Sequence, residues 1–100
     1  MLTALWDRVI ALIRSGRWPA KRRAHLAQEG ECQCCGRTKE LEVHHMLPVH
    51  VGGPELDDTN LITLCHDCHF VVGHGCDWKA WRKDCRMVSE YLRKTKVTHV

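Results

Sequence analysis

Two Cys-x-x-Cys pairs constrain this chain more than any other feature: Cys32 with Cys35, and Cys65 with Cys68. Two such pairs usually bind one Zn²⁺ tetrahedrally, with each sulfur about 2.3 Å from the metal. A chain of 100 residues buries only a modest core and often needs such a staple. We therefore expect one small domain in which a structural zinc ion contributes to folding.

The cysteine usage also indicates a reducing compartment. The chain has seven cysteines, an odd number that does not suit a disulfide framework. The first residues do not read as a secretory leader, and Asp7 and Arg8 interrupt any apolar run that could cross a membrane. We expect a cytoplasmic location and no membrane association. Cys34 offers a competing sulfur, but the two-residue spacing that matches the second pair favours Cys32 and Cys35 as the zinc ligands. We expect Cys76 and Cys85 to be small buried or idle thiols.

The segment between the two cysteine pairs has the pattern of a strand, a loop and a second strand. Apolar and polar residues alternate over residues 39–45, and residues 61–64 form a second short strand pattern. Residues 48–60 between them carry the Gly-Gly-Pro and Asp-Asp sequences typical of loops. Because successive side chains of a strand point to opposite faces, His44 and His45 can have different roles.

Three helices are expected around this segment. An apolar stripe over residues 2–13 predicts an amphipathic helix that faces either the core or a partner surface. A second helix should begin near Trp18 and end near Gly30. A third should begin at the N-cap Asp77 and bury its tryptophans against the zinc site, although base stacking is an alternative role for them. Its stripe comprises Trp78, Trp81, Cys85, Val88 and Leu92.

The predicted fold class is α+β, with a helical extension (1–30), a zinc-stapled core (31–76) and a closing helix (77–100). The extension is basic, because no acidic residue lies between Asp7 and Glu29. Its cations either contact phosphate or form a solvated face. The candidates for phosphate contact are Arg17, Lys21, Arg22 and Arg23. The net charge of +3 falls to about +1 when four thiolates bind one Zn²⁺, so binding of a polyanion depends on where these cations lie.

The histidine doublet has the chemistry that phosphodiester hydrolysis needs. The reaction requires an activated water, a positive charge near the phosphate and stabilisation of the leaving oxygen. A histidine titrates near neutral pH, so one ring of a doublet can bind a metal ion while the other accepts a proton. The alternative is a non-catalytic zinc module that binds nucleic acid or protein. That alternative explains the cysteines but gives no role to His44, His45 or Asn60.

The segment from Cys32 to His74 resembles the HNH endonucleases, which have a ββα-metal fold. The resemblance rests on Leu-Glu-Val-His-His-Met-Leu-Pro at residues 41–48 and Asn-Leu-Ile-Thr-Leu-Cys-His-Asp-Cys-His at residues 60–69. The four-cysteine zinc clip is similar to that of small bacterial and phage members. The resemblance implies a DNA endonuclease whose contacts go mainly to the phosphate backbone, with little sequence preference.

The resemblance also implies roles for individual residues. His44 and His69 would bind the catalytic divalent ion, which would be Mg²⁺, Mn²⁺, Ni²⁺ or Zn²⁺. His45 would be the general base, and Asn60 would hold its ring by a hydrogen bond across the loop. The protein would act as a monomer or homodimer, with a phage packaging or host defence partner.

His74 departs from the pattern of the family. Some relatives place a third ligand one helical turn after the position of His69, but that position is Gly73 here. A five-residue step leaves His74 well off the face of His69 on an α-helix. His74 could therefore bind the ion only if the helix ends or distorts there, and its alternative role is contact with phosphate.

Overall fold

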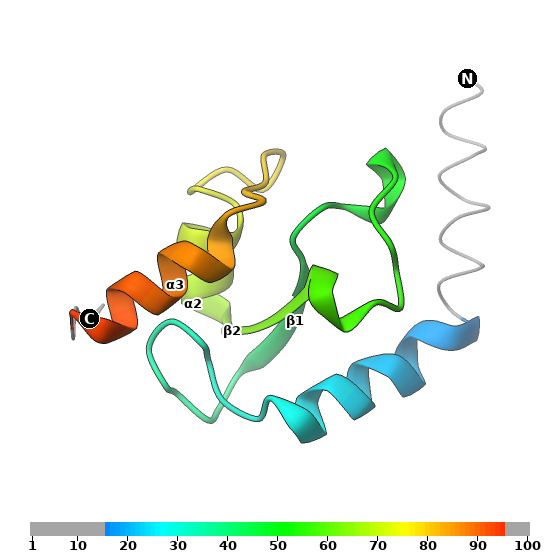
Figure 1. Cartoon of the computed structure of the whole chain (residues 1–100), viewed down its shortest axis with the longest axis horizontal. Helices are drawn as coiled ribbons and strands as arrows, with labels where there is room; N and C mark the ends of the chain where they lie inside the picture. Colours follow the sequence, from blue (N-terminus) through cyan, green and yellow to red (C-terminus); the bar gives the residue numbers. More distant parts are fainter. Residues whose placement is uncertain (1–15, 96–100) are drawn as a thin grey trace.

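The computed structural model describes residues 16–95 of the chain. It begins with a helix over residues 16–28 (the basic helix), and the expected helix over residues 2–13 lies outside the described residues. The elements that follow are β1 (Leu41–His45), two short 3-10 helices (Val49–Val51 and Asp58–Asn60), β2 (Leu61–Cys65), α2 (His66–Cys68), a π-helical turn (His69–Gly73) and α3 (Cys85–Lys94) (Figure 1). Among residues 16–95, no helix has the length and apolar character needed to cross a membrane.

β1 and β2 form a two-stranded antiparallel sheet in which His44 lies opposite Ile62 and His45 opposite Leu61. Every residue of β2 is buried, and its apolar and β-branched side chains suit that position. β1 is mostly half-buried. In Figure 1 the sheet lies between the basic helix and the pair formed by α2 and α3.

The core surrounds the two cysteine pairs. Leu41, Val88 and Leu92 pack against a buried cluster that draws on β2, α2, the π-helical turn and α3. Its members are Cys32, Cys34, Met46, Ile62, Leu64, Cys65, Cys68, Val72 and Cys85. More than half of them are cysteines, so the apolar burial is small and a metal ion has much to add to stability. The α+β class is confirmed, with four cysteines clustered as a zinc-bound fold requires.

The closing helix is shorter than its apolar stripe predicts. It begins at Cys85 rather than at Asp77. The Asp77 carboxylate accepts from the Lys79 amide, as an N-cap would, but only a turn follows, and the Arg82 amide donates to the Gly73 carbonyl. Trp78 and Trp81 lie in this loop with 51% and 37% of their surface exposed. The prediction that both tryptophans are buried against the zinc site was therefore wrong.

A partly buried carboxylate joins the basic helix to the rest of the fold. Glu29 accepts hydrogen bonds from the Thr63 amide (2.8 Å) and from Arg86 (3.2 and 3.3 Å), and its Oε1 lies 3.0 Å from His25 Nε2. Burial alone would raise the pKa of Glu29, but these contacts outweigh it and hold the pKa below its usual value. His25 is itself buried and bridges to Asp58. This network fixes the basic helix against β2, α3 and the loop before β2.

Candidate metal centres and active site

The four cysteines have the geometry of a zinc site. Cys32, Cys35, Cys65 and Cys68 each offer one sulfur, and all four sulfurs lie within 4.8 Å of one another. The Sγ atoms of Cys35 and Cys65 are 3.8 Å apart. Sulfurs at about 2.3 Å from a tetrahedral zinc ion are separated by about 3.8 Å, so the spacing fits Zn²⁺.

A tight knuckle presents the first pair of sulfurs. Gly36 has a φ of 82°, a conformation that favours glycine, and its amide donates to the Cys32 carbonyl (2.8 Å). Hydrogen bonding with Cys68 and with nearby amides lowers the pKa of Cys32 to about 4, which favours the thiolate that binds metal. Cys34 is also buried and lies close enough to Cys68 to interact with it, but it is outside the four-sulfur group.

The other two cysteines lie outside the zinc site. Cys85 is fully buried, and burial raises the pKa of its thiol to about 11, so it behaves as a small core residue. Cys76 is exposed on the loop that follows the π-helical turn.

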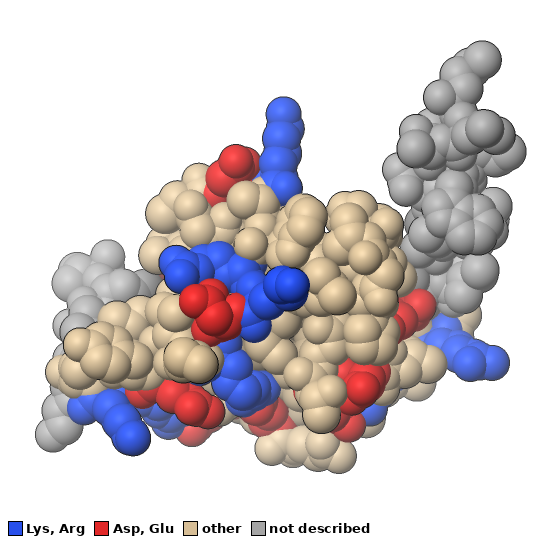
Figure 2. Space-filling model, turned by 45° about the horizontal axis from the view of Figure 1, so that its top comes forward, with Lys and Arg blue, Asp and Glu red and all other residues tan. Residues whose placement is uncertain are grey.

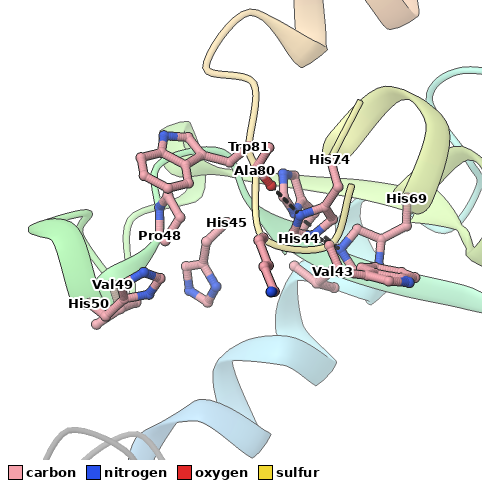
Figure 3. A pocket seen from close by; sticks show the side chains of 12 residues that line it. Val43, His44, His45, Pro48, Val49, His50, His69, His74, Ala80 and Trp81 are labelled. Atoms are coloured by element: carbon pink, nitrogen blue, oxygen red, sulfur yellow. Dashed lines mark hydrogen bonds between the residues drawn. The ribbon is translucent and has the colours of Figure 1, made fainter. Parts of the chain in front are cut away.

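Three histidines converge at a second candidate metal site. His44 comes from β1, and His69 and His74 come from the two ends of the π-helical turn. His69 Nε2 lies 3.1 Å from His44 Nδ1 and 3.1 Å from His74 Nε2. These three side chains (the histidine cluster) gather at one end of the pocket in Figure 3.

Hydrogen bonds on the outer side of the cluster fix which nitrogen of two rings carries the hydrogen. The Glu42 carboxylate accepts from His69 Nδ1 (2.6 Å), and the Ala80 carbonyl accepts from His74 Nδ1 (2.6 Å). In the neutral rings both Nε2 atoms therefore carry lone pairs, and these face each other. Nitrogens bound at about 2.0–2.1 Å to a tetrahedral ion are about 3.3 Å apart, so a divalent cation fits between them.

His44 completes the cluster as a neutral ring. Burial, followed by the neighbouring His69 and His74, lowers the pKa of His44 to about 3. Its Nε2 is buried without a hydrogen-bond partner among the described residues. Burial also lowers the pKa of His69, although Glu42 opposes this effect. Neutral imidazoles are the form that binds metal ions, so the electrostatics agree with the geometry.

The π-helical turn is the reason that His74 reaches the cluster. The His74 amide donates to the His69 carbonyl (3.1 Å), which is a five-residue step. Such a step widens the turn and places residue 74 above residue 69, whereas an α-helix would place residue 73 there. His74 could join His69 only if the helix ends or distorts between them, and the π-helical turn is such a distortion.

His45 lies in the same pocket but on the other side of β1 from His44. The pocket has a volume of about 230 Å³ and is lined by both histidines of the doublet and by the rest of the histidine cluster. His45 Nε2 donates to the Glu55 carbonyl (3.0 Å), and the ring centroid lies 4.5 Å from that of Trp18 on the basic helix. In Figure 3 His45 lies between the histidine cluster and the group formed by Pro48, His50 and Trp81.

Asn60 forms hydrogen bonds across the loop that follows β1. Its side chain accepts from the Leu47 amide (2.9 Å) and donates to the carbonyls of Leu47 (2.9 Å) and Pro54 (3.0 Å). The sequence-based expectation was that Asn60 orients His45 by a hydrogen bond across the loop. The amide does form hydrogen bonds across the loop, and the residue after Pro54 is Glu55, whose carbonyl accepts from His45.

Asn60→Ala is expected to lower both stability and turnover. The substitution leaves an amide and two carbonyls of the loop without partners at a position that is 8% exposed, which costs about 1–3 kcal/mol. Urea unfolding of the zinc-loaded protein measures this loss. Turnover falls because the Glu55 carbonyl is no longer held beside His45. A wild-type unfolding midpoint together with a wild-type rate would contradict this role for Asn60.

The basic helix does not present an uninterrupted cationic face. Lys21 forms an ion pair with Asp58 (2.9 Å), and Arg22 lies 3.4 Å from the Leu41 carbonyl. Arg17 and Arg23 are exposed. Figure 2 likewise shows basic and acidic side chains side by side on the face it displays. Of the four expected phosphate contacts, Lys21 and Arg22 therefore have partners within the fold.

Two residues near the site were not singled out by the sequence. Glu42 holds His69 and also accepts from His66 Nδ1 (3.0 Å). Glu42 could have been predicted near the site, because it lies on the same face of β1 as His44. Trp18 contacts His45 from a helix far away in the sequence, and no local pattern marks it.

Comparison with known proteins agrees with this geometry. Residues 32–74 match the family described as HNH endonuclease. The chain is 35% identical over 57 residues to the "Putative COX1/OXI3 intron 2 protein" of Saccharomyces cerevisiae, a match that covers 46% of this chain and 7% of that protein. The chain thus spans only a small part of the curated relative it matches. No solved structure was found to match. The matched segment carries both cysteine pairs and the histidine cluster, and the match supports membership of the HNH endonuclease family.

Proposed function

We propose that this protein is a metal-dependent DNA endonuclease that hydrolyses phosphodiester bonds. The observation that carries the proposal is the convergence of three imidazoles in a pocket that a fourth imidazole, that of His45, also lines. A structural zinc ion on the four cysteines would hold β2 and the first knuckle in place around this pocket.

His45 is the general base of the proposed reaction. Its Nε2 donates a hydrogen bond to the Glu55 carbonyl, so in the neutral ring Nδ1 is the nitrogen that can take a proton from water. The water then attacks phosphorus and the P–O bond to the leaving oxygen breaks. Trp18 and the Glu55 carbonyl keep the ring in one orientation, which a general base needs.

His44, His69 and His74 would hold the catalytic ion. A bound divalent cation stabilises the charge that develops on the phosphate and on the leaving oxygen. Glu42 and the Ala80 carbonyl keep the correct nitrogen of His69 and of His74 directed at the ion.

The substrate follows from the family and from the charge. Family members are named as endonucleases, and the exposed cations Arg17 and Arg23 lie on the basic helix, whose Trp18 contacts His45. Contacts of this kind to phosphate carry no base sequence, so cleavage with little sequence preference is proposed. Cytoplasmic location, phage or bacterial origin, a monomer or homodimer, and a packaging or defence partner stay predictions.

The donor set predicts the preference for metal ions. Imidazole suits Ni²⁺ and Zn²⁺, whereas Mg²⁺ and Mn²⁺ favour oxygen ligands. Supercoiled plasmid should be nicked by the zinc-loaded protein at lower concentrations of Ni²⁺ than of Mn²⁺ or Mg²⁺. A chelator should stop the reaction, and the zinc content and circular dichroism of the treated protein should show that the four-cysteine ion and the fold are retained. If no divalent ion supports cleavage by folded protein, the non-catalytic zinc module becomes the better hypothesis.

A further inference from the structure

Two exposed tryptophans flank the pocket of the histidine cluster. Trp78 and Trp81 both line this pocket, together with Lys79 between them in sequence. Tryptophan is rarely left this exposed in a small fold with little apolar burial, and neither ring is needed for the core cluster. Their position beside the proposed active site therefore calls for a role in binding.

The loop that carries the tryptophans is fixed to the π-helical turn. The Arg82 amide donates to the Gly73 carbonyl (3.1 Å), and the Cys76 amide donates to the Phe70 carbonyl (3.0 Å). His74 Nδ1 donates to the Ala80 carbonyl, midway between these ends. The backbone that carries the two indole rings is thus fixed before any ligand arrives, so ordering the loop costs little on binding.

The rings lie on different sides of the pocket. The Trp78 ring centroid is 5.2 Å from that of His69 and 4.9 Å from that of His74, so it packs on the histidine cluster. The Trp81 ring meets His50 edge to face at 6.2 Å. Figure 3 shows Trp81 and His50 at the end of the pocket opposite His44 and His69. Aromatic surface is therefore present at both ends, with the candidate metal site at one of them.

Nucleobases are the ligands that such surfaces take. Every base has a flat face that stacks on an indole, and stacking on exposed aromatics is the usual means of holding single strands. In duplex DNA these faces are covered by neighbouring bases, so the pocket can use its tryptophans only on unpaired bases. Lys79 adds a cation that suits the adjacent phosphate.

We propose that Trp81, Trp78 and Lys79 form a subsite for unpaired nucleotides next to the scissile phosphate, which directs the enzyme to DNA with single-stranded stretches. This inference rests on the proposed endonuclease function and specifies its substrate. The subsite discriminates by whether the bases are free to stack, and base identity has little effect.

Trp81 is the residue to test, because Trp78 also packs on two proposed metal ligands. Cleavage of a labelled duplex is compared with cleavage of the same duplex carrying a central run of unpaired thymidines. Wild-type protein should have the higher kcat/KM on the second DNA. Trp81→Ala should lower the ratio of the two kcat/KM values about tenfold, and Trp81→Phe should restore most of it. Tyr91→Ala removes an exposed aromatic of α3 that does not line the pocket and should leave the ratio unchanged.

A binding measurement separates this inference from the proposed function. A thymidine oligonucleotide is titrated into His45→Ala protein, and quenching of tryptophan fluorescence is followed. In the double variant that also carries Trp81→Ala, much of this quenching should be lost. If the wild type cleaves DNA but the ratio and the quenching do not depend on Trp81, the subsite is overturned while the nuclease stands. If no DNA is cleaved yet thymidines still quench Trp81, the nuclease fails and the subsite stands.

Discussion

His45→Ala protein is expected to lose plasmid nicking by a factor of about 10² to 10⁴, which is the contribution of a general base. The residue lines the pocket beside the histidine cluster, and the Glu55 carbonyl fixes its ring. The three imidazoles that are proposed to bind the ion do not depend on it, so metal binding should persist. The rate of conversion of supercoiled to nicked DNA, measured at saturating Ni²⁺, gives the loss.

Two controls distinguish lost chemistry from lost structure. The zinc content and thermal unfolding of the His45→Ala protein should match those of the wild type, because His45 is only partly buried and lies outside the core cluster. Added imidazole should restore part of the rate, since a small base can occupy the space that the substitution opens. Nicking at the wild-type rate would remove His45 from the role of general base.

Cys65→Ser is expected to unfold the domain. Binding of a structural zinc ion contributes about 10 kcal/mol or more to the folding of small modules, and a domain of this kind is stable by only about 5–15 kcal/mol in total. Cys65 is fully buried at the end of β2, opposite Leu41 in β1. Loss of its sulfur therefore removes a metal ligand and leaves a hydroxyl in the centre of the core.

Circular dichroism and zinc content measure this effect. The Cys65→Ser protein should show no cooperative thermal transition and less than one bound zinc ion. Cys76→Ser is the matched control, because this thiol is exposed and outside the cysteine cluster. It should unfold at the wild-type temperature. A Cys65→Ser protein that stays folded without zinc would contradict the assignment of the cysteines to a structural site.

The spacing of the cysteines and the alternation of β1 predicted most of the framework. Pairs of thiols can be recognised because a metal ion imposes a fixed geometry on the chain, and that geometry leaves a local signature. His44 and His69 come together because β1 pairs with β2, and the turn after β2 brings residue 69 back across the sheet. This long-range arrangement was available only through the resemblance to a family.

Other features depended on competition between local interactions. The stripe from Trp78 to Leu92 fits a helix, but the turn at Asp77 and the hydrogen bond from Arg82 to Gly73 hold its first half as a loop. Asn60 could hydrogen-bond to many groups, and only the path of the loop decides that its partners are backbone atoms. Neither outcome follows from periodicity, because tertiary contacts override propensity at both places.

The wide turn at residues 69–73 makes the spacing between two proposed ligands adjustable. Val71, inside this turn, is 51% exposed, so the surplus residue bulges into solvent and displaces nothing in the interior. A lineage can therefore gain or lose one residue here and still direct two imidazoles at a common point. The strand that carries His44 cannot gain or lose a residue in this way, since a one-residue slip would turn the ring to the opposite face of the sheet.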